Sequence, residues 1–109
     1  MAYDEELAAR VRHLLRRRRG ITERKMFGGL AFMLNGNMCC GMLNDVLVLR
    51  LGPELAAEAL EEPHTREMDF TGRPMKSMIY VEPAGYESDE DLREWVNFAV
   101  DFAKSLPAK

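Results

Sequence analysis

The chain has 109 residues, of which 47% are hydrophobic and 30% are charged, and its formal net charge is −3. These values exclude a disordered or fibrous protein, fit one domain over residues 1–109, and argue against a dedicated nucleic-acid binder. No apolar run approaches the roughly 20 residues of a membrane span, and the beginning of the chain lacks the apolar stretch of a secretory signal. We therefore expect a cytoplasmic protein that contacts no membrane.

An amphipathic helix is predicted from about Tyr3 to Arg18. Acidic residues begin this segment and arginines end it, which is the charge order that the helix dipole favours, and Gly20 stops it. Its apolar residues recur at the spacings of one helical face. They are Tyr3, Leu7, Val11, Leu14 and Leu15.

Three strands are expected next. The apolar run 30–34 leads into Asn35-Gly36, a dipeptide that readily accepts the two positive φ values of a type I′ turn, so 30–34 and 38–43 should form a hairpin. A third strand follows over 46–51. These runs are apolar almost without interruption, which indicates that both faces of the strands are buried or that a partner covers one of them.

Gly28 and Gly29 precede these strands. Paired glycines inside an apolar stretch predict a bend, a bulge or a close approach of two backbones. A phosphate-binding loop is not indicated, because the Gly-x-Gly-x-x-Gly pattern is absent and no Gly-Lys-Ser/Thr follows.

The second half of the chain should contain two helices and one or two strands. A short helix is predicted to begin at Pro53 and to end at Pro63, and the clearest strand covers 77–81. Ser88 is expected to cap the last helix. The apolar face of that helix consists of Leu92, Trp95, Val96, Ala99, Ala103 and Leu106, widened by Phe98 and Phe102.

The predicted order is therefore α-β-β-β-α-β-β-α. Helices lie at both ends of the chain and one lies between strands. An antiparallel sheet of four to five strands that these helices cover would bury the apolar faces, which makes the expected fold α+β.

Residues 68–76 form the most distinctive segment of the sequence. Gly72 can adopt positive φ, and Pro74 fixes its own φ near −65° and favours an extended conformation for Arg73. Gly72 and Pro74 are therefore predicted to form a stiff turn that directs cations outward.

Five cations are candidate contacts for an anion or a partner. Arg66, Arg73 and Lys76 surround this turn, while Arg24 and Lys25 lie in the first strand region. A salt bridge from Arg66 or Arg73 to a neighbouring acid such as Glu67 or Asp69 is the structural alternative.

The two cysteines, Cys39 and Cys40, are adjacent in the sequence. Neighbouring residues of a strand point to opposite faces, so we expect no disulfide between them and two buried, inert thiols. Further Cys or His ligands at zinc-site spacings are absent, and we expect neither a metal nor another cofactor. A thiol-based enzyme is an alternative, in which an exposed cysteine would meet His64 and Asp69.

Three motifs occur in a recognisable order: KMFGGLAFM over 25–33, LRLGPE over 49–54, and MDFTGRPMK over 68–76 with Tyr80-Val81 behind it. Together they resemble the N-terminal domain of the TfoX (Sxy) competence-regulator family, over nearly the whole chain. The set is fairly specific, although each motif alone is weak.

The resemblance implies a fold like that of type III secretion chaperones, with helices around a five-stranded antiparallel sheet, and a bacterial source. Founding members of the family carry a second, C-terminal domain and act with a cyclic-AMP receptor protein on DNA-uptake genes. We expect this chain to be a stand-alone version without such a second domain. The resemblance brings no catalytic residue.

We expect a non-enzymatic regulatory domain that binds another protein or a second copy of itself. The eight methionines fit this hypothesis, because flexible thioethers suit adaptable surfaces, although they also fill cores. Direct nucleic-acid binding through the basic segment 16–25 is an alternative, and its affinity would fall steeply with salt. A small-anion site at the cations near residue 73 is another.

Overall fold

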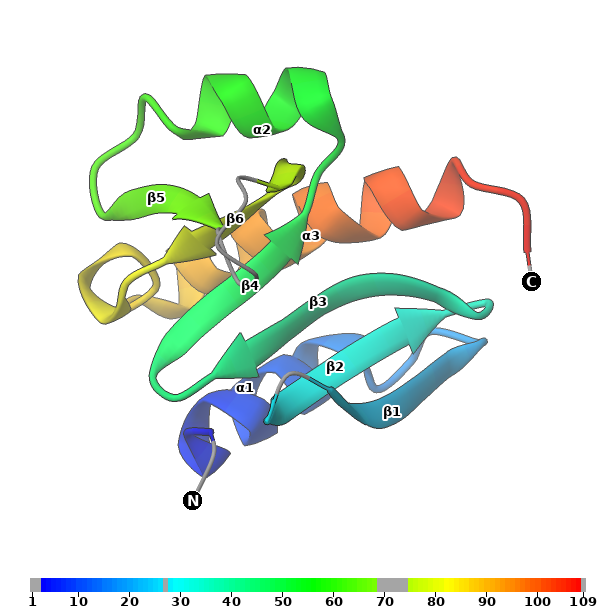
Figure 1. Ribbon diagram of the computed structural model, residues 1–109. Helices are drawn as coiled ribbons and strands as arrows, with labels where there is room; N and C mark the ends of the chain where they lie inside the picture. The colour runs from blue at the N-terminus through cyan, green and yellow to red at the C-terminus, as the bar shows by residue number, and fades with distance from the viewer. Residues whose placement is uncertain (1–2, 27, 69–74, 109) are drawn as a thin grey trace.

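Six antiparallel strands form one sheet over the residues that the computed structural model describes, which are 3–26, 28–68 and 75–108 (Figure 1). Their order across the sheet is β1-β2-β3-β4-β6-β5. The strands are β1 Ile21–Met26, β2 Gly29–Leu34, β3 Asn37–Leu43, β4 Val46–Arg50, β5 Thr65–Met68 and β6 Met75–Val81. The helices are α1 Glu5–Leu15, α2 Pro53–Ala59, the 3-10 helix η1 Pro83–Gly85 and α3 Asp89–Lys104.

The predicted α+β fold is confirmed, with one strand more than expected. The additional strand is β1, which pairs with β2 along its whole length. The sequence did not reveal it because its four central residues, 22–25, are all exposed and include three charges. No apolar alternation was therefore available to mark it as a strand.

Helix α1 is shorter than predicted at both ends. It begins at Glu5, because the Asp4 carboxylate caps it by accepting hydrogen bonds from the backbone N–H groups of Glu6 and Leu7, at 2.9 and 3.2 Å. Tyr3 instead forms a β-bridge with Asn44. Along the described chain, no helix has the length and apolarity that crossing a membrane requires.

The central strands bury both of their faces, as their apolar runs predicted. One face joins the buried residues of α1, α2 and α3 in a single cluster, which we call the helix-side core. Apart from the adjacent Cys39 and Cys40, its strand residues alternate with those of the opposite face. The strand residues of the helix-side core are Leu30, Phe32, Leu34, Cys39, Cys40, Met42, Leu47, Leu49, Ile79 and Val81.

The opposite face of the sheet forms a second, smaller cluster. Within the described residues, no helix contributes a buried side chain to it. Its buried members are Ala31, Met33, Met38, Val46, Val48, Met68, Met78 and Tyr80. Methionines therefore fill cores on both faces, since Met42 lies in the helix-side core.

A β-bulge interrupts the pairing of β2 and β3. Phe32 pairs with Cys40 and Met33 pairs with Met38, so Cys39 is the extra residue. Both cysteines consequently belong to the helix-side core, and the prediction that they point to opposite faces is wrong. Both are nevertheless free thiols, and no disulfide joins them.

Turns and caps agree closely with the local sequence. Asn35 and Gly36 both have positive φ, 52° and 84°, as a type I′ turn requires. Ser88 caps α3 by accepting a hydrogen bond at 3.0 Å from the Asp91 N–H. At the chain's end, the buried Asn37 side chain donates through Nδ2 to the carbonyl of Pro107 at 2.8 Å.

Gly52 sets the entry into α2. It has a φ of 85°, and a Cβ built there would lie 2.6 Å from Cε1 of Phe102 on α3. Glycine suits this position for two reasons: it adopts the left-handed backbone conformation without strain, and it has no Cβ to clash with the aromatic ring. Pro53 follows it in the first helical turn, as predicted.

Replacing Gly52 should cost more than replacing a glycine with the same backbone conformation in open space. Gly28 offers that control, since its φ is 77° and, apart from its chain neighbours, no described residue has an atom within 4 Å of a built Cβ. We expect Gly52→Ala to lower the free energy of unfolding by about 3 kcal/mol and Gly28→Ala by about 1 kcal/mol. Urea denaturation measures both, and equal losses would contradict the contact with the Phe102 ring.

Tyr86 connects the segment after η1 to the rest of the molecule. Its hydroxyl donates to the carbonyl of Asp45 at 2.5 Å, and the Arg10 guanidinium lies over its ring, 5.8 Å from the centroid. Burial, and after it the nearby carboxylates of Asp4 and Asp45, raise the pKa of Tyr86 to about 12.

Tyr86 should make stability depend on alkaline pH. Its pKa is about 10 in an unfolded chain and about 12 in the folded state, so its stabilising effect is complete below pH 10 and is lost as the pH rises toward 12. We expect Tyr86→Phe to cost about 1 kcal/mol at neutral pH and to remove this part of the alkaline decline. Denaturation of both proteins between pH 8 and about 12 tests this. Parallel declines would show that another group is responsible.

Candidate functional site

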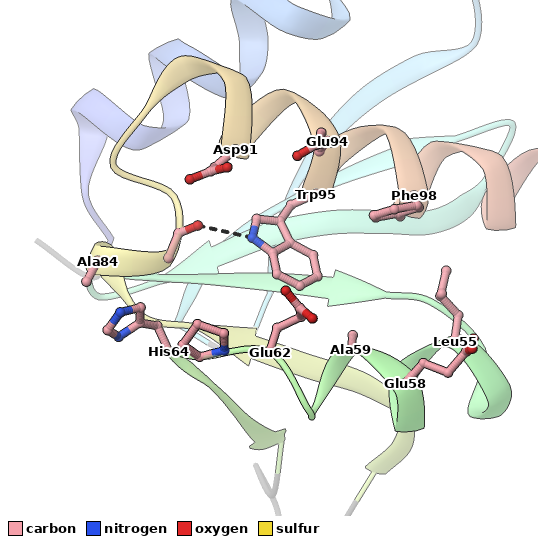
Figure 2. Close-up of a pocket in the computed structure, with 12 residues that line it drawn as sticks. Leu55, Glu58, Ala59, Glu62, His64, Ala84, Asp91, Glu94, Trp95 and Phe98 are labelled. Atoms are coloured by element: carbon pink, nitrogen blue, oxygen red, sulfur yellow. Dashed lines mark hydrogen bonds between the residues drawn. The ribbon is translucent and has the colours of Figure 1, made fainter.

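A groove of about 470 Å³ lies between α2, η1 and α3 (Figure 2). One wall comes from α2 and the residues that follow it, and the other comes from one face of α3. The groove is lined by Leu55, Glu58, Ala59, Glu62, Pro63, His64, Ala84, Gly85, Asp91, Glu94, Trp95 and Phe98.

The apolar part of the groove is centred on two aromatic rings of α3. Trp95 and Phe98 meet edge to face, with ring centroids 6.3 Å apart and an interplanar angle of 67°. Leu55 and Ala59 of α2 lie across from them. Phe98 is 43% exposed and is the one large hydrophobic residue with such exposure in the described chain, so the prediction that it widens the core face is wrong.

Trp95 is held in place by η1. Its indole Nε1 donates to the carbonyl of Gly85 at 3.1 Å. Gly85 is itself tightly packed, because a Cβ there would lie 2.7 Å from Cγ1 of Val81 and 3.1 Å from Cβ of His64. This packing fixes the end of the groove and the orientation of the indole ring.

Four carboxylates surround this apolar centre. Glu58 and Glu62 belong to the α2 wall, and Asp91 and Glu94 belong to the α3 wall. None of the four takes part in an ion pair with a described residue, and no lysine or arginine lines the groove. The ion pairs of the described chain are Arg10–Asp89, Arg12–Glu23 and Arg66–Glu82.

His64 marks the exit from the α2 wall. It has a φ of 66°, which is uncommon for a residue other than glycine. Its carbonyl accepts a hydrogen bond from the Glu82 N–H at 2.8 Å, and this holds the turn that leads into β5. Among the described residues, no group of three or more His, Cys, Asp or Glu side chains is arranged to hold a metal ion.

The cations selected from the sequence lie away from the groove. Arg24 and Lys25 are exposed on the edge strand β1, where positive charge opposes pairing with another sheet. Lys76 lies on β6 and Arg66 on the opposite edge strand β5, about 19 and 24 Å from β1 across the sheet at ordinary strand spacing. Arg73, together with Gly72 and Pro74, lies outside the described residues.

Arg66 already has partners within the protein. Its guanidinium forms an ion pair with Glu82 and lies over the Tyr80 ring, 4.5 Å from the centroid. The neighbouring acid expected from the sequence, Glu67, is not the partner. Exposed pairs of this kind contribute about 0 to 1 kcal/mol to stability.

The two thiols are poorly suited to nucleophilic chemistry. Cys39 and Cys40 have no exposed surface. A hydrogen bond with the Cys39 thiol, followed by burial, raises the pKa of Cys40 well above its ordinary value. A thiol in this state forms little thiolate at neutral pH.

Sequence reasoning missed the groove, although each wall has a local signal. Asp91, Trp95 and Phe98 recur at three- and four-residue spacings and so share one face of α3. Glu58 and Glu62 are four residues apart, the first near the end of α2 and the second in the turn that follows it. That the two faces oppose each other follows only from the packing of α2 and α3 on the same side of the sheet.

The chain is similar to a known protein domain. The family model of the TfoX N-terminal domain matches residues 13–103, which is most of the chain. No curated protein and no solved structure matches the chain.

The two aromatic residues of the groove should differ in their effect on stability. Trp95→Phe leaves the Gly85 carbonyl without its donor, so we expect a loss of about 1 kcal/mol in the free energy of unfolding. Phe98→Ala removes a side chain that is 43% exposed and should cost about 0.5 kcal/mol or less. Thermal denaturation compares the two, and a larger loss for Phe98→Ala would place that ring in the core.

Proposed function

Because this chain belongs to the TfoX N-terminal domain family, we propose that it acts as a non-enzymatic regulatory domain that binds a protein partner through the groove between α2 and α3. The observation that carries this proposal is the position of Phe98. The most exposed large hydrophobic side chain of the described residues stands in a concave site, beside the indole ring of Trp95.

Aromatic side chains in a concave site are characteristic of protein interfaces. Tryptophan and phenylalanine are enriched in the buried centre of interfaces, and tryptophan is prominent among the residues that dominate binding energy. Trp95 is already oriented by the hydrogen bond to Gly85, so little conformational entropy is lost when a partner packs against it.

Catalysis finds less support in the groove. The residues that line it include no cysteine, serine, threonine, lysine or tyrosine, so only carboxylates and His64 could act as nucleophiles there. The one histidine, His64, has carboxylates and apolar groups as its neighbours in the groove, and the two thiols are buried elsewhere.

Nucleic-acid binding also finds less support. Of the cations selected from the sequence as contacts, Arg24 and Lys25 lie on one edge strand of the sheet, whereas Arg66 and Lys76 lie on β5 and β6 toward the opposite edge. Arg66 is engaged by Glu82. The groove itself is lined by carboxylates, which repel phosphate groups.

An affinity pull-down from the native host tests the proposed function. The baits are the original chain, Phe98→Ala, and Asn97→Ala as a control on the exposed side of the same helix. We expect a specific protein to be captured by the first and third baits and to be reduced about tenfold with Phe98→Ala, because central aromatic contacts dominate interfaces. Mass spectrometry quantifies the captured protein.

Two results would contradict the proposal. Capture that is equal with Phe98→Ala and the original chain would place the contact elsewhere on the molecule. Capture of no protein by any bait, together with a monomeric species in sedimentation, would count against an interaction domain altogether.

A further inference from the structure

We propose that the groove takes a cationic, amphipathic segment of the partner protein, in which a bulky apolar side chain packs against Trp95 and Phe98 while flanking lysines or arginines meet the carboxylates. This inference rests on the proposed function and extends it, because it states the chemistry of the partner. The volume of about 470 Å³ accommodates a few side chains and not a folded domain, so the occupant is a linear segment.

The charge of the groove is the first argument. Glu58 and Glu62 approach from one wall and Asp91 and Glu94 from the other, and no described cation pairs with any of them. All four side chains are exposed, and like charges gathered along a cleft create a negative potential that attracts cations. A cationic segment complements this potential, whereas a neutral or acidic segment does not.

The position of Glu62 relative to the indole is the second argument. Figure 2 shows the Glu62 carboxylate pointing from the α2 wall toward the ring of Trp95. A lysine or arginine that pairs with Glu62 would therefore lie close to the indole, where a cation–π contact adds to the ion pair. Phe98 and Leu55 continue the apolar surface beside this point.

The amphipathic pattern follows from both arguments together. The apolar centre lies between the two walls, and the carboxylates lie on either side of it. A segment that places one bulky apolar side chain between two cations matches this arrangement. A purely basic segment would leave Phe98 exposed, and a purely apolar one would leave four carboxylates partly desolvated without a partner.

A selection experiment with defined variants tests the proposal. A random peptide library displayed on phage is selected on the original chain, and the enriched peptides are synthesised. Because Trp95 is the single tryptophan of the chain, its fluorescence reports occupation of the groove by any peptide without tryptophan. Binding is also measured by anisotropy of labelled peptides at low and high salt.

Matched variants separate charge from shape. The test variant is the pair Glu58→Gln and Glu62→Gln, and the control is the pair Glu54→Gln and Glu61→Gln. All four residues are exposed, but the control pair lies outside the groove lining, and both variants lose two negative charges. Circular dichroism confirms that each variant is folded.

We expect the enriched peptides to carry lysine or arginine on both sides of a bulky apolar residue. Their binding should change Trp95 fluorescence, weaken with salt, fall about tenfold in the test variant, and stay unchanged in the control. Phe98→Ala should weaken binding as well.

Other outcomes would overturn it. Neutral or acidic peptides that lose binding with Phe98→Ala but not with the test variant would refute the cationic partner and keep the groove as the proposed contact. Peptides that bind without changing Trp95 fluorescence, or a selection that enriches nothing, would remove the groove itself and with it the proposed function. Self-association abolished by replacing the exposed Arg16–Arg19 turn would identify a second copy as the occupant instead.

Discussion

The structure depends on a sheet whose central strands are apolar on both faces. Such strands cannot leave either face in water, and the α-helices α1, α2 and α3 all pack on one of these faces to form the helix-side core. This crowding brings α2 and α3 next to each other, joined where Gly52 passes the Phe102 ring. The groove therefore lies between two helices that pack on the same face of the sheet. Its shape follows from the way these helices cover that face.

Features set by a few neighbouring residues were predictable from the sequence. The Asn35-Gly36 turn, the Ser88 cap and the start of α2 at Pro53 each depend on the conformational preference of one or two residues. Strand β1 was not predictable, because its charged residues carry no strand pattern and its conformation comes from backbone pairing with β2. The bulge at Cys39 is equally non-local, since only the register with β2 reveals an extra residue.

The candidate site was even less predictable from the sequence, because it depends on contacts between distant parts of the chain. Cations such as Arg66 were predicted as contacts from the sequence, because runs of charge and turns can be recognised from neighbouring residues. In the structure Arg66 forms an ion pair with Glu82. The groove requires two helix faces from distant parts of the chain to oppose each other. Phe98 was assigned to the core because its spacing matched the apolar face of α3, but periodicity cannot tell whether the edge of such a face meets the sheet or a groove.

The hydrogen bond from Asn37 to Pro107 also fixes the position from which a tag, a fused protein or a linker to a surface would leave the molecule. It holds the last residues of the described chain beside the turn between β2 and β3 (Figure 1). From Trp95 to the end of α3 at Lys104 the helix rises about 14 Å. A linker joined to the C-terminal tail therefore departs from the far end of α3, so a tag, a fused fluorophore or a coated surface would leave the acidic groove open to solvent.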